Sequence, residues 1–194
     1  MSPDLLETMN GRAGHFLLES GHHGDLWLDL DRLLVSAADL QRWAGGLADL
    51  LREHDVSAVC GPLVGGAVVA EFVAARLEVD CYYAQRLASA TDVSYRIPAR
   101  RHDELAGRRV AVVDDVVNAG SAVAKTRDAL AEIGARPVVV GALLALGSHA
   151  EEQTKQWGAE FTALATVPSN LWDPDDCPLC RDGVALERPG EESG

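Results

Sequence analysis

The sequence predicts one α/β domain with a mostly parallel, twisted sheet flanked by helices. Apolar runs of strand length alternate with segments whose apolar residues recur at helical spacing, which is the pattern of a parallel sheet covered by helices. The chain has 194 residues, of which 47% are hydrophobic. A chain of this size and composition can bury a core without help from disulfides or metals.

Residues 1–35 are predicted to form a small N-terminal hood outside the main sheet. A short helix is expected over residues 3–9. Strands are expected over His15–Glu19 and Leu26–Leu30, because these apolar runs bracket a polar turn rich in Gly and His. We expect this pair of strands to cap the core.

Residues 36–167 are predicted to form the α/β core. Ser36 and Asp39 approximate a capping box at the start of a helix that reaches His54. The strands expected after it cover residues 58–60, 79–84, 110–113, 137–146 and 161–165. The helices between them are expected over 67–77, 121–133 and 150–157. A Gly-rich turn follows the first of these strands, a long polar segment over 85–107 follows the second, and a second turn follows the third.

The last segment, residues 168–194, is an acidic tail rich in Pro and Gly that contains a C-x-x-C motif. Seven acids stand against two arginines from Asp173 onward. Such a composition predicts a loop-like and partly mobile tail.

Net charge and hydropathy exclude several functions. The chain carries 30 acidic and 17 basic residues, a formal charge of −13. Acidic surfaces repel nucleic-acid phosphates and anionic lipids, so we expect neither nucleic acid nor membrane as a partner. The apolar run 137–146 is far shorter than the roughly 20 residues that span a bilayer, and residues 1–10 lack the pattern of a signal peptide. We therefore expect a cytoplasmic protein with reduced cysteines.

The sharpest motif joins an acidic pair to a loop of small residues. Asp114 and Asp115 follow the apolar strand 110–113, at the strand end where ligands of such sheets bind. Adjacent carboxylates repel each other, so we expect a ribose diol, a magnesium ion or both to face them. The loop Asn118–Ala122 opens a helix, whose backbone N–H groups form an anion site. The alternative is an ordinary strand–turn–helix in which Asp caps the helix and Gly makes the turn.

This segment resembles the phosphoribosyl pyrophosphate (PRPP) signature of the type I phosphoribosyltransferases, and the resemblance implies their fold. It implies that Asp114 and Asp115 hold the ribose 2′ and 3′ hydroxyls and that the loop Asn118–Ala122 wraps the 5′-phosphate. The PRPP-binding candidates are Asp114, Asp115, Val116, Val117, Asn118, Ala119, Gly120, Ser121 and Ala122.

A second glycine-rich turn stands between a predicted strand and a predicted helix. Its backbone amides are accessible because no large side chain blocks approach, although glycines at such turns are often only structural. In the family that this chain resembles, a loop at this place binds pyrophosphate. The pyrophosphate candidates are Gly61, Pro62, Leu63, Val64, Gly65 and Gly66.

The stretch Phe16–Asp29 is similar to the hood of the orotate phosphoribosyltransferases, in which a Ser-Gly turn precedes an aromatic-containing strand. The resemblance implies a site for the base beside this turn. The base-side candidates are Glu19, Ser20, Gly21, His22 and His23. For the two histidines, the alternative is that they simply face solvent in a polar turn.

Charged positions differ from the subfamily pattern. Glu19 stands where the subfamily has a lysine, and Gly147–His149 stands where it has an arginine. The only lysines are Lys125 and Lys155, so the cations of the polar segment 85–107 are arginines. Arg86 is our catalytic candidate, with Arg96, Arg100 and Arg101 as further cations.

Cys177 and Cys180 have the spacing of one zinc knuckle. Zinc needs four ligands, and no second motif of this kind exists in the sequence. A zinc site would have to recruit Cys60, Cys81, His149 or a second subunit. We favour a reduced surface pair over zinc.

The resemblance implies a magnesium-dependent phosphoribosyltransferase of the orotate-like branch, acting in nucleotide synthesis or salvage. In that reaction a ring nitrogen of the base attacks C1 of PRPP and pyrophosphate leaves. A homodimer is implied as well. The alternative is a PRPP-binding regulator of the same fold that has lost the catalytic cation. The sequence leaves the identity of the base open.

Overall fold

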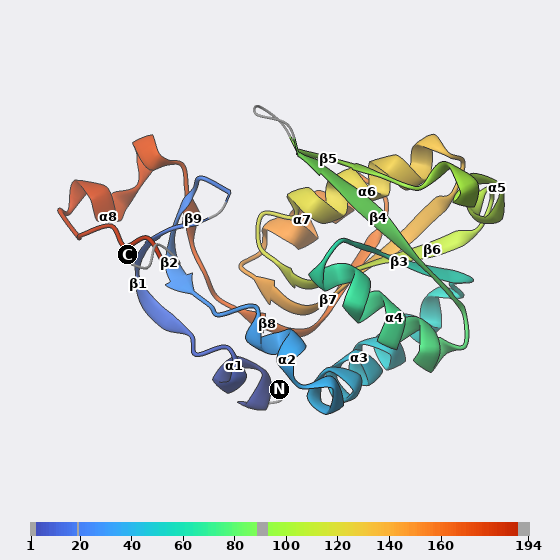
Figure 1. Ribbon diagram of the computed structural model, residues 1–194. Helices are drawn as coiled ribbons and strands as arrows, with labels where there is room; N and C mark the ends of the chain where they lie inside the picture. Colours follow the sequence, from blue (N-terminus) through green and yellow to red (C-terminus); the bar gives the residue numbers. More distant parts are fainter. Residues whose placement is uncertain (1–2, 19, 89–92, 190–194) are drawn as a thin grey trace.

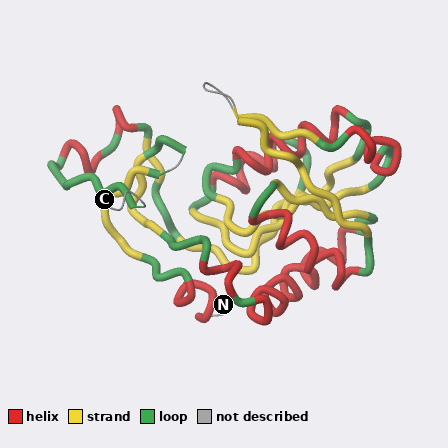
Figure 2. Tube along the Cα trace, in the orientation of Figure 1, coloured by secondary structure: helices red, strands yellow, loops and turns green. Residues whose placement is uncertain are grey.

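The computed structural model describes residues 3–18, 20–88 and 93–189 and contains two sheets (Figure 1). The predicted α/β architecture is confirmed, with a mostly parallel central sheet and helices on both of its faces (Figure 2). A smaller sheet lies to one side of this core and forms the hood. Among the described residues, no helix has the length and apolar character needed to cross a membrane.

The central sheet has six strands in the order β5-β4-β3-β6-β7-β8. All neighbours are parallel except β4 and β5, which form an antiparallel pair at one edge. The strands are β3 (Ala58–Pro62), β4 (Asp80–Ala88), β5 (Val93–Arg96), β6 (Arg109–Val117), β7 (Arg136–Leu146) and β8 (Glu160–Val167). β3 and β6 are therefore buried neighbours, and their carboxyl ends lie side by side.

Alternate strand residues build the cores on the two faces of this sheet. Val59, Ala111 and Val113 face a core that contains α3 (Ala37–Leu51) and α4 (Gly65–Leu77). Cys60, Val110 and Val112 face the second core. That core is completed by residues of α5 (His102–Leu105) and α6 (Ser121–Glu132), while α7 (His149–Gln156) packs beside β8. The alternation follows from the two-residue period of a strand.

The hood is a three-stranded antiparallel sheet in the order β1-β2-β9. Its strands are β1 (Arg12–Leu17), β2 (His23–Trp27) and β9 (Leu171–Trp172), and α1 (Pro3–Thr8) leads into it. The expected second strand begins three residues earlier than predicted. The reason is its register with β1, in which Arg12 lies opposite Trp27 and Leu17 opposite His23.

Residues 168–189 of the C-terminal segment pack on the hood, which differs from the expected loop-like tail. It forms β9, the 3-10 turn η3 (Pro174–Asp176) and α8 (Pro178–Arg181). The Asp25 carboxylate accepts hydrogen bonds from the Asn170 backbone N–H at 2.8 Å and the Asn170 side-chain amide at 2.6 Å. Later in the segment, the Glu187 carbonyl accepts a hydrogen bond of 2.9 Å from the Leu17 backbone N–H at the end of β1. Tail residues thus pair with both edges of the β1–β2 hairpin.

Outside the C-terminal segment, the unexpected elements include the helices α2 (Arg32–Val35) and α5 and the edge strand β5. β5 lies in the predicted polar segment and pairs with the end of β4, so that Arg86 lies opposite Tyr95. β5 has only four residues, so its alternation of apolar and polar residues is too short to identify a strand without the pairing partner β4.

Candidate functional site

The acidic pair lies inside β6 rather than after it. Asp114 is opposite Ala142 of β7, and the ladder continues to Val117. Asp114 is only 8% exposed, while Asp115 is half-buried. The longer β7 extends hydrogen bonding past the predicted strand end, and this holds both carboxylates on a rigid backbone.

Burial and the neighbouring carboxylate both act on the pKa of Asp114. Burial raises the pKa of Asp114 well above its ordinary value, and the neighbouring Asp115 charge raises it further. Few compensating bonds are at hand: the Asp115 backbone N–H donates to Asp114 Oδ1 at 3.1 Å, and the Val116 N–H donates to Asp115 Oδ1 at 2.8 Å. A cation or a group of hydroxyl donors would relieve this cost.

The glycine-rich turn between β3 and α4 packs directly against the acidic pair. A Cβ atom on Gly65 would lie 2.2 Å from Asp115 Oδ2, and one on Gly66 would lie 2.6 Å from Asp114 Oδ1. A Cβ atom on Gly61 would meet the Gly66 carbonyl oxygen at 2.0 Å. Only glycine allows the turn to fold this tightly. The two motifs that the sequence separates by about fifty residues are thus in contact.

The loop after β6 presents the start of α6. Gly120 has φ +74° and is the N-cap of α6, so no side chain caps this helix end. The first N–H groups of a helix have no partner within it, and the helix dipole favours an anion there. Residues 116–123 line a cleft of about 600 Å³. The predicted phosphate loop therefore opens into a cavity large enough for a sugar phosphate and a base.

The hood forms the opposite wall of this cleft. Residues 26–31, including Trp27, line it together with Ser20 and the side chains of Asp114 and Tyr95. Burial raises the pKa of Tyr95, and the Asp114 charge adds to this effect, whereas Arg86 lowers it. The tyrosine, the arginine and the acidic pair thus share one electrostatic environment.

Of the four arginines expected as cations, Arg86 lines the cleft. The other three bind neighbours: Arg96 donates to Gln85 at 3.2 Å, Arg100 to the Tyr83 hydroxyl at 3.4 Å, and Arg101 to Glu104 at 2.7 Å. The position of Arg86 on β4, which ends beside β3, brings it to the site.

Lys125 also lines the cleft, although the sequence analysis placed it outside the predicted cation segment. It lies on α6, one helical turn after Ser121, and its ammonium donates to the Val93 carbonyl. The sequence does contain a signal for this position. Lys125 is four residues after Ser121 of the phosphate loop, and residues four apart share one face of a helix.

The base-side candidates separate into two groups. Ser20 lines the cleft, beside Gly21 in its turn (φ +83°), whereas Glu19 is outside the described residues. His22 contacts the Ser20 hydroxyl at 3.2 Å and the Asp173 carboxylate at 3.4 Å. His23 is 6% exposed, and its Nδ1 lies 3.1 Å from His15 Nε2 inside the hood.

Cys177 and Cys180 lie with His15 and His23, not with the cysteines considered as their partners. Cys60 and Cys81 belong to the central sheet, and the side chain of His149 is outside the described part of the chain. Cys60 and Cys81, which were considered as further zinc ligands, are therefore not partners of Cys177 and Cys180. Sequence spacing gave no sign that the β1–β2 hairpin would face the tail.

Comparisons with known proteins agree with this geometry. The family model described as phosphoribosyl transferase domain matches residues 27–175. An orotate phosphoribosyltransferase from Thermotoga petrophila is 32% identical over 191 residues, covering 98% of this chain and 97% of that protein.

Two solved structures share the fold. The orotate phosphoribosyltransferase from Aeropyrum pernix aligns with a TM-score of 0.65 and 26% identity over 84% of this chain and 90% of the other. The orotate phosphoribosyltransferase from Mycobacterium tuberculosis in complex with PRPP aligns with a TM-score of 0.63 and 20% identity over 84% and 92%. The similarity to these two structures therefore extends beyond the motifs to most of the strands and helices of this chain.

Replacing Asp114 with Asn is expected to stabilise the fold at neutral pH. Because the native pKa of Asp114 is raised, the wild-type fold loses stability as pH rises from the ordinary carboxyl range through that raised pKa. The gain of Asp114→Asn should therefore grow with pH and vanish below about pH 4. Urea unfolding of both proteins across this range checks it.

The exposed Asp39 is the control, because Ser36 and Arg42 lower its pKa and Asp39→Asn should destabilise at neutral pH. Equal stability of Asp114→Asn and wild type at every pH would contradict the direction assigned to Asp114.

Gly61→Ala is expected to destabilise the fold by about 1–3 kcal/mol or more, since its methyl group meets backbone that cannot move cheaply. Gly45→Ala is the matched control, because Gly45 lies inside α3 with open space around it. Alanine at this position should raise the free energy of unfolding by about 0.5–1 kcal/mol. Urea midpoints of the two variants decide the matter, and a Gly61→Ala protein as stable as Gly45→Ala would show that the turn is not tightly packed.

Proposed function

The chain belongs to the phosphoribosyltransferase family, and on that premise we propose that it transfers the 5-phosphoribosyl group of PRPP to orotate, with release of pyrophosphate. One observation carries the proposal: the glycine turn packs against the acidic pair, and Asp114 of that pair lines the same cleft as the uncapped start of α6. Sites for a diol, a diphosphate and a monophosphate at one place suit PRPP.

Each part of PRPP has a proposed partner. Asp114 and Asp115 accept hydrogen bonds from the ribose 2′ and 3′ hydroxyls. These donors offset the electrostatic repulsion between the two carboxylates. The backbone N–H groups of residues 118–122 bind the 5′-phosphate at the positive end of α6. The turn 61–66 binds pyrophosphate through its backbone. These contacts fix C1 of the ribose in line with the attacking ring nitrogen.

Arg86 is the proposed cation for the departing diphosphate. The transition state of this transfer separates positive charge on the ribose from negative charge on the leaving group, so a positioned guanidinium in a partly closed cleft stabilises it. Lys125 lies on the 5′-phosphate side, one turn along α6. Arg86 would therefore supply the positive charge in a segment, residues 85–107, that contains no lysine.

Mg²⁺ is proposed as the metal that accompanies PRPP. The donor set fits it, because Mg²⁺ prefers oxygen ligands, keeps several waters and is usually bound through substrate phosphates. Two carboxylates lie against the diphosphate turn, with Asp115 Oδ2 facing Gly65. We propose no direct protein ligand; the acidic pair would hold the hydrated ion electrostatically. When bound, the ion neutralises charge on the leaving diphosphate.

The choice of orotate rests on the relatives. The Thermotoga petrophila enzyme matches nearly the whole chain, including the hood and the C-terminal segment. The hood wall of the cleft is the part that contacts a base under this proposal, with Ser20 and Trp27 as lining residues. Homodimer formation is a further proposal from the family and awaits a measurement of mass in solution.

The alternative function is a PRPP-binding regulator without catalysis. The observation that favours it is the lack of any lysine between residues 85 and 107. Arg86 lies in the cleft, and this favours the enzyme.

Pyrophosphate release from PRPP and Mg²⁺ tests both functions, with orotate, uracil, adenine, guanine, hypoxanthine and xanthine as acceptors. We expect release with orotate in clear excess over the other bases. Release with a different base would refute orotate but keep the enzyme. PRPP binding without release for any base would favour the regulator.

Arg86→Ala is expected to lower kcat on the order of 10²- to 10³-fold, because it removes a donor to the leaving group. Arg100→Ala is the matched control, since Arg100 binds the Tyr83 hydroxyl on the exposed side of the same sheet edge and should leave kcat near wild type. Equal activity of the two variants in the pyrophosphate assay would remove Arg86 from the mechanism.

A further inference from the structure

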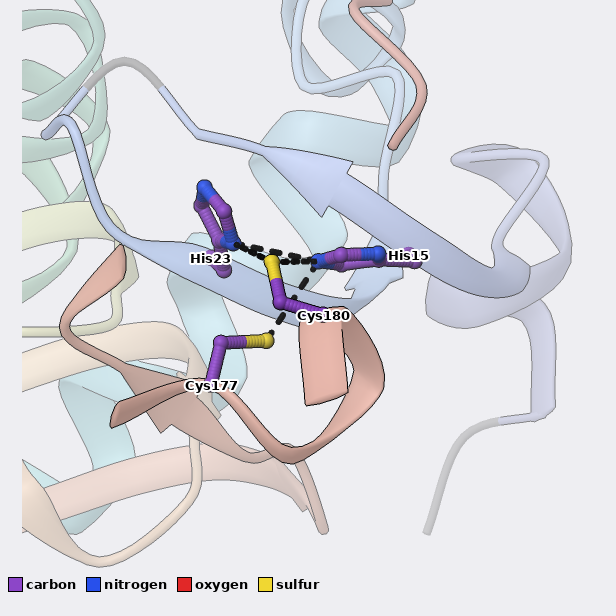
Figure 3. A group of neighbouring side chains, drawn as sticks. All are labelled: His15, His23, Cys177 and Cys180. Atoms are coloured by element: carbon purple, nitrogen blue, oxygen red, sulfur yellow. Dashed lines mark hydrogen bonds between the residues drawn. The ribbon is translucent and has the colours of Figure 1, made fainter. Parts of the chain in front are cut away.

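Four metal-binding side chains converge inside the hood, apart from the PRPP cleft. His15 of β1, His23 of β2, Cys177 and Cys180 each offer one ligand atom, and these atoms all lie within 4.8 Å of one another. Figure 3 shows the two imidazoles and the two thiols pointing toward one centre. They come from segments more than 150 residues apart, so the fold alone brings them together.

Of four distances between these atoms, three fall in the range of a tetrahedral metal site, and the fourth, between the two imidazole nitrogens, is slightly shorter. His15 Nε2 lies 3.1 Å from His23 Nδ1 and 3.4 Å from Cys177 Sγ, and Cys180 Sγ lies 3.3 Å from His23 Nδ1. Cys180 Sγ lies 3.7 Å from His15 Nε2. Zinc bonds of about 2.0 Å to nitrogen and about 2.3 Å to sulfur place tetrahedral ligands between about 3.3 and 3.8 Å apart.

The surroundings of His15 prepare it as a ligand. Its Nδ1 lies 2.9 Å from the Val184 carbonyl oxygen, which can only accept, so the proton of the neutral ring is on Nδ1. The Nε2 lone pair then points at the other three ligand atoms. A backbone carbonyl that holds the second ring nitrogen is the usual support of a metal-binding histidine.

Burial shields three of the four ligands from water. His15, His23 and Cys177 are 1%, 6% and 1% exposed, and Cys180 is exposed at the rim. Four protein ligands leave no open position, which is the mark of a structural site rather than a catalytic one. Two sulfur and two nitrogen donors in tetrahedral arrangement select zinc among the common divalent ions.

A disulfide explains the cluster less well. Both cysteines are free thiols in this structure. Their sulfur atoms each contact an imidazole nitrogen, and a bond between the two sulfurs would leave His15 Nε2 and His23 Nδ1 buried with only each other as partner. A metal ion instead satisfies all four groups at once.

We propose that His15, His23, Cys177 and Cys180 bind a structural Zn²⁺ that fastens the C-terminal segment to the β1–β2 hairpin. Each Cys–metal bond forms with release of the thiol proton to solvent. The ion would hold α8 against the hood whose β2 strand reaches the cleft at Trp27. The ion thus supports one wall of the cleft without contacting substrate, and the site stands whether or not the transferase activity is confirmed.

Metal content of the full-length protein tests the proposal. Protein purified without chelator under reducing conditions should contain about one zinc per chain by elemental analysis. Cys180→Ser and His23→Ala should each lose it. Cys81→Ser and His22→Ala are matched controls outside the cluster and should retain it. Zinc retained by both cluster variants would overturn the proposal.

A second measurement uses only the wild-type protein, so it does not depend on the variants folding. Co²⁺ exchanged for zinc should give the visible and near-ultraviolet bands of tetrahedral thiolate coordination. Chelator should lower the Tm and expose Cys177 and Cys180 to alkylation, and added Zn²⁺ should reverse both effects. Protein that binds neither Zn²⁺ nor Co²⁺ after full reduction would overturn the proposal. So would a mass two daltons lower under ambient conditions, which identifies a disulfide pair.

Discussion

The repulsion between two adjacent carboxylates is the constraint on which the site depends. Asp114 and Asp115 lie within β6, where the backbone pairs with β7 beyond both residues and Asp114 is buried. The turn after β3 then has to approach these carboxylates without any side chain of its own. Holding two carboxylates this way costs free energy, and in the proposed reaction the hydroxyls of PRPP and its metal ion would lower that cost.

The sequence predicted the strands and helices around this cleft well because each motif is local. The order of strands and helices follows from apolar periodicity, and the acidic pair and both glycine-containing loops are contiguous in the chain. What brings Gly65 to Asp115 is the adjacency of β3 and β6, which the rule for ligand sites in open sheets anticipates. Arg86 was expected as a cation, and its place beside the cleft follows from the antiparallel β4–β5 pair at the sheet edge.

The hood could not be predicted to the same depth, because its contacts join the two ends of the chain. β9 has only two residues, and it becomes a strand through pairing with Gly24 and His23. The same pairing explains why an acidic tail rich in Pro and Gly is ordered: Asp25, Asn170 and Glu187 give it backbone and side-chain partners that composition does not reveal. The burial of His23 in the hood likewise depends on residues 150 positions away.

The most direct test of the central claim is a crystal structure of the protein with PRPP and Mg²⁺. The account predicts the ribose 2′ and 3′ hydroxyls within hydrogen-bond distance of the Asp114 and Asp115 carboxylates, with the 5′-phosphate on the backbone of residues 118–122 and the diphosphate on residues 61–66. PRPP bound with its ribose away from the acidic pair, or with the two phosphate ends exchanged, would contradict the account.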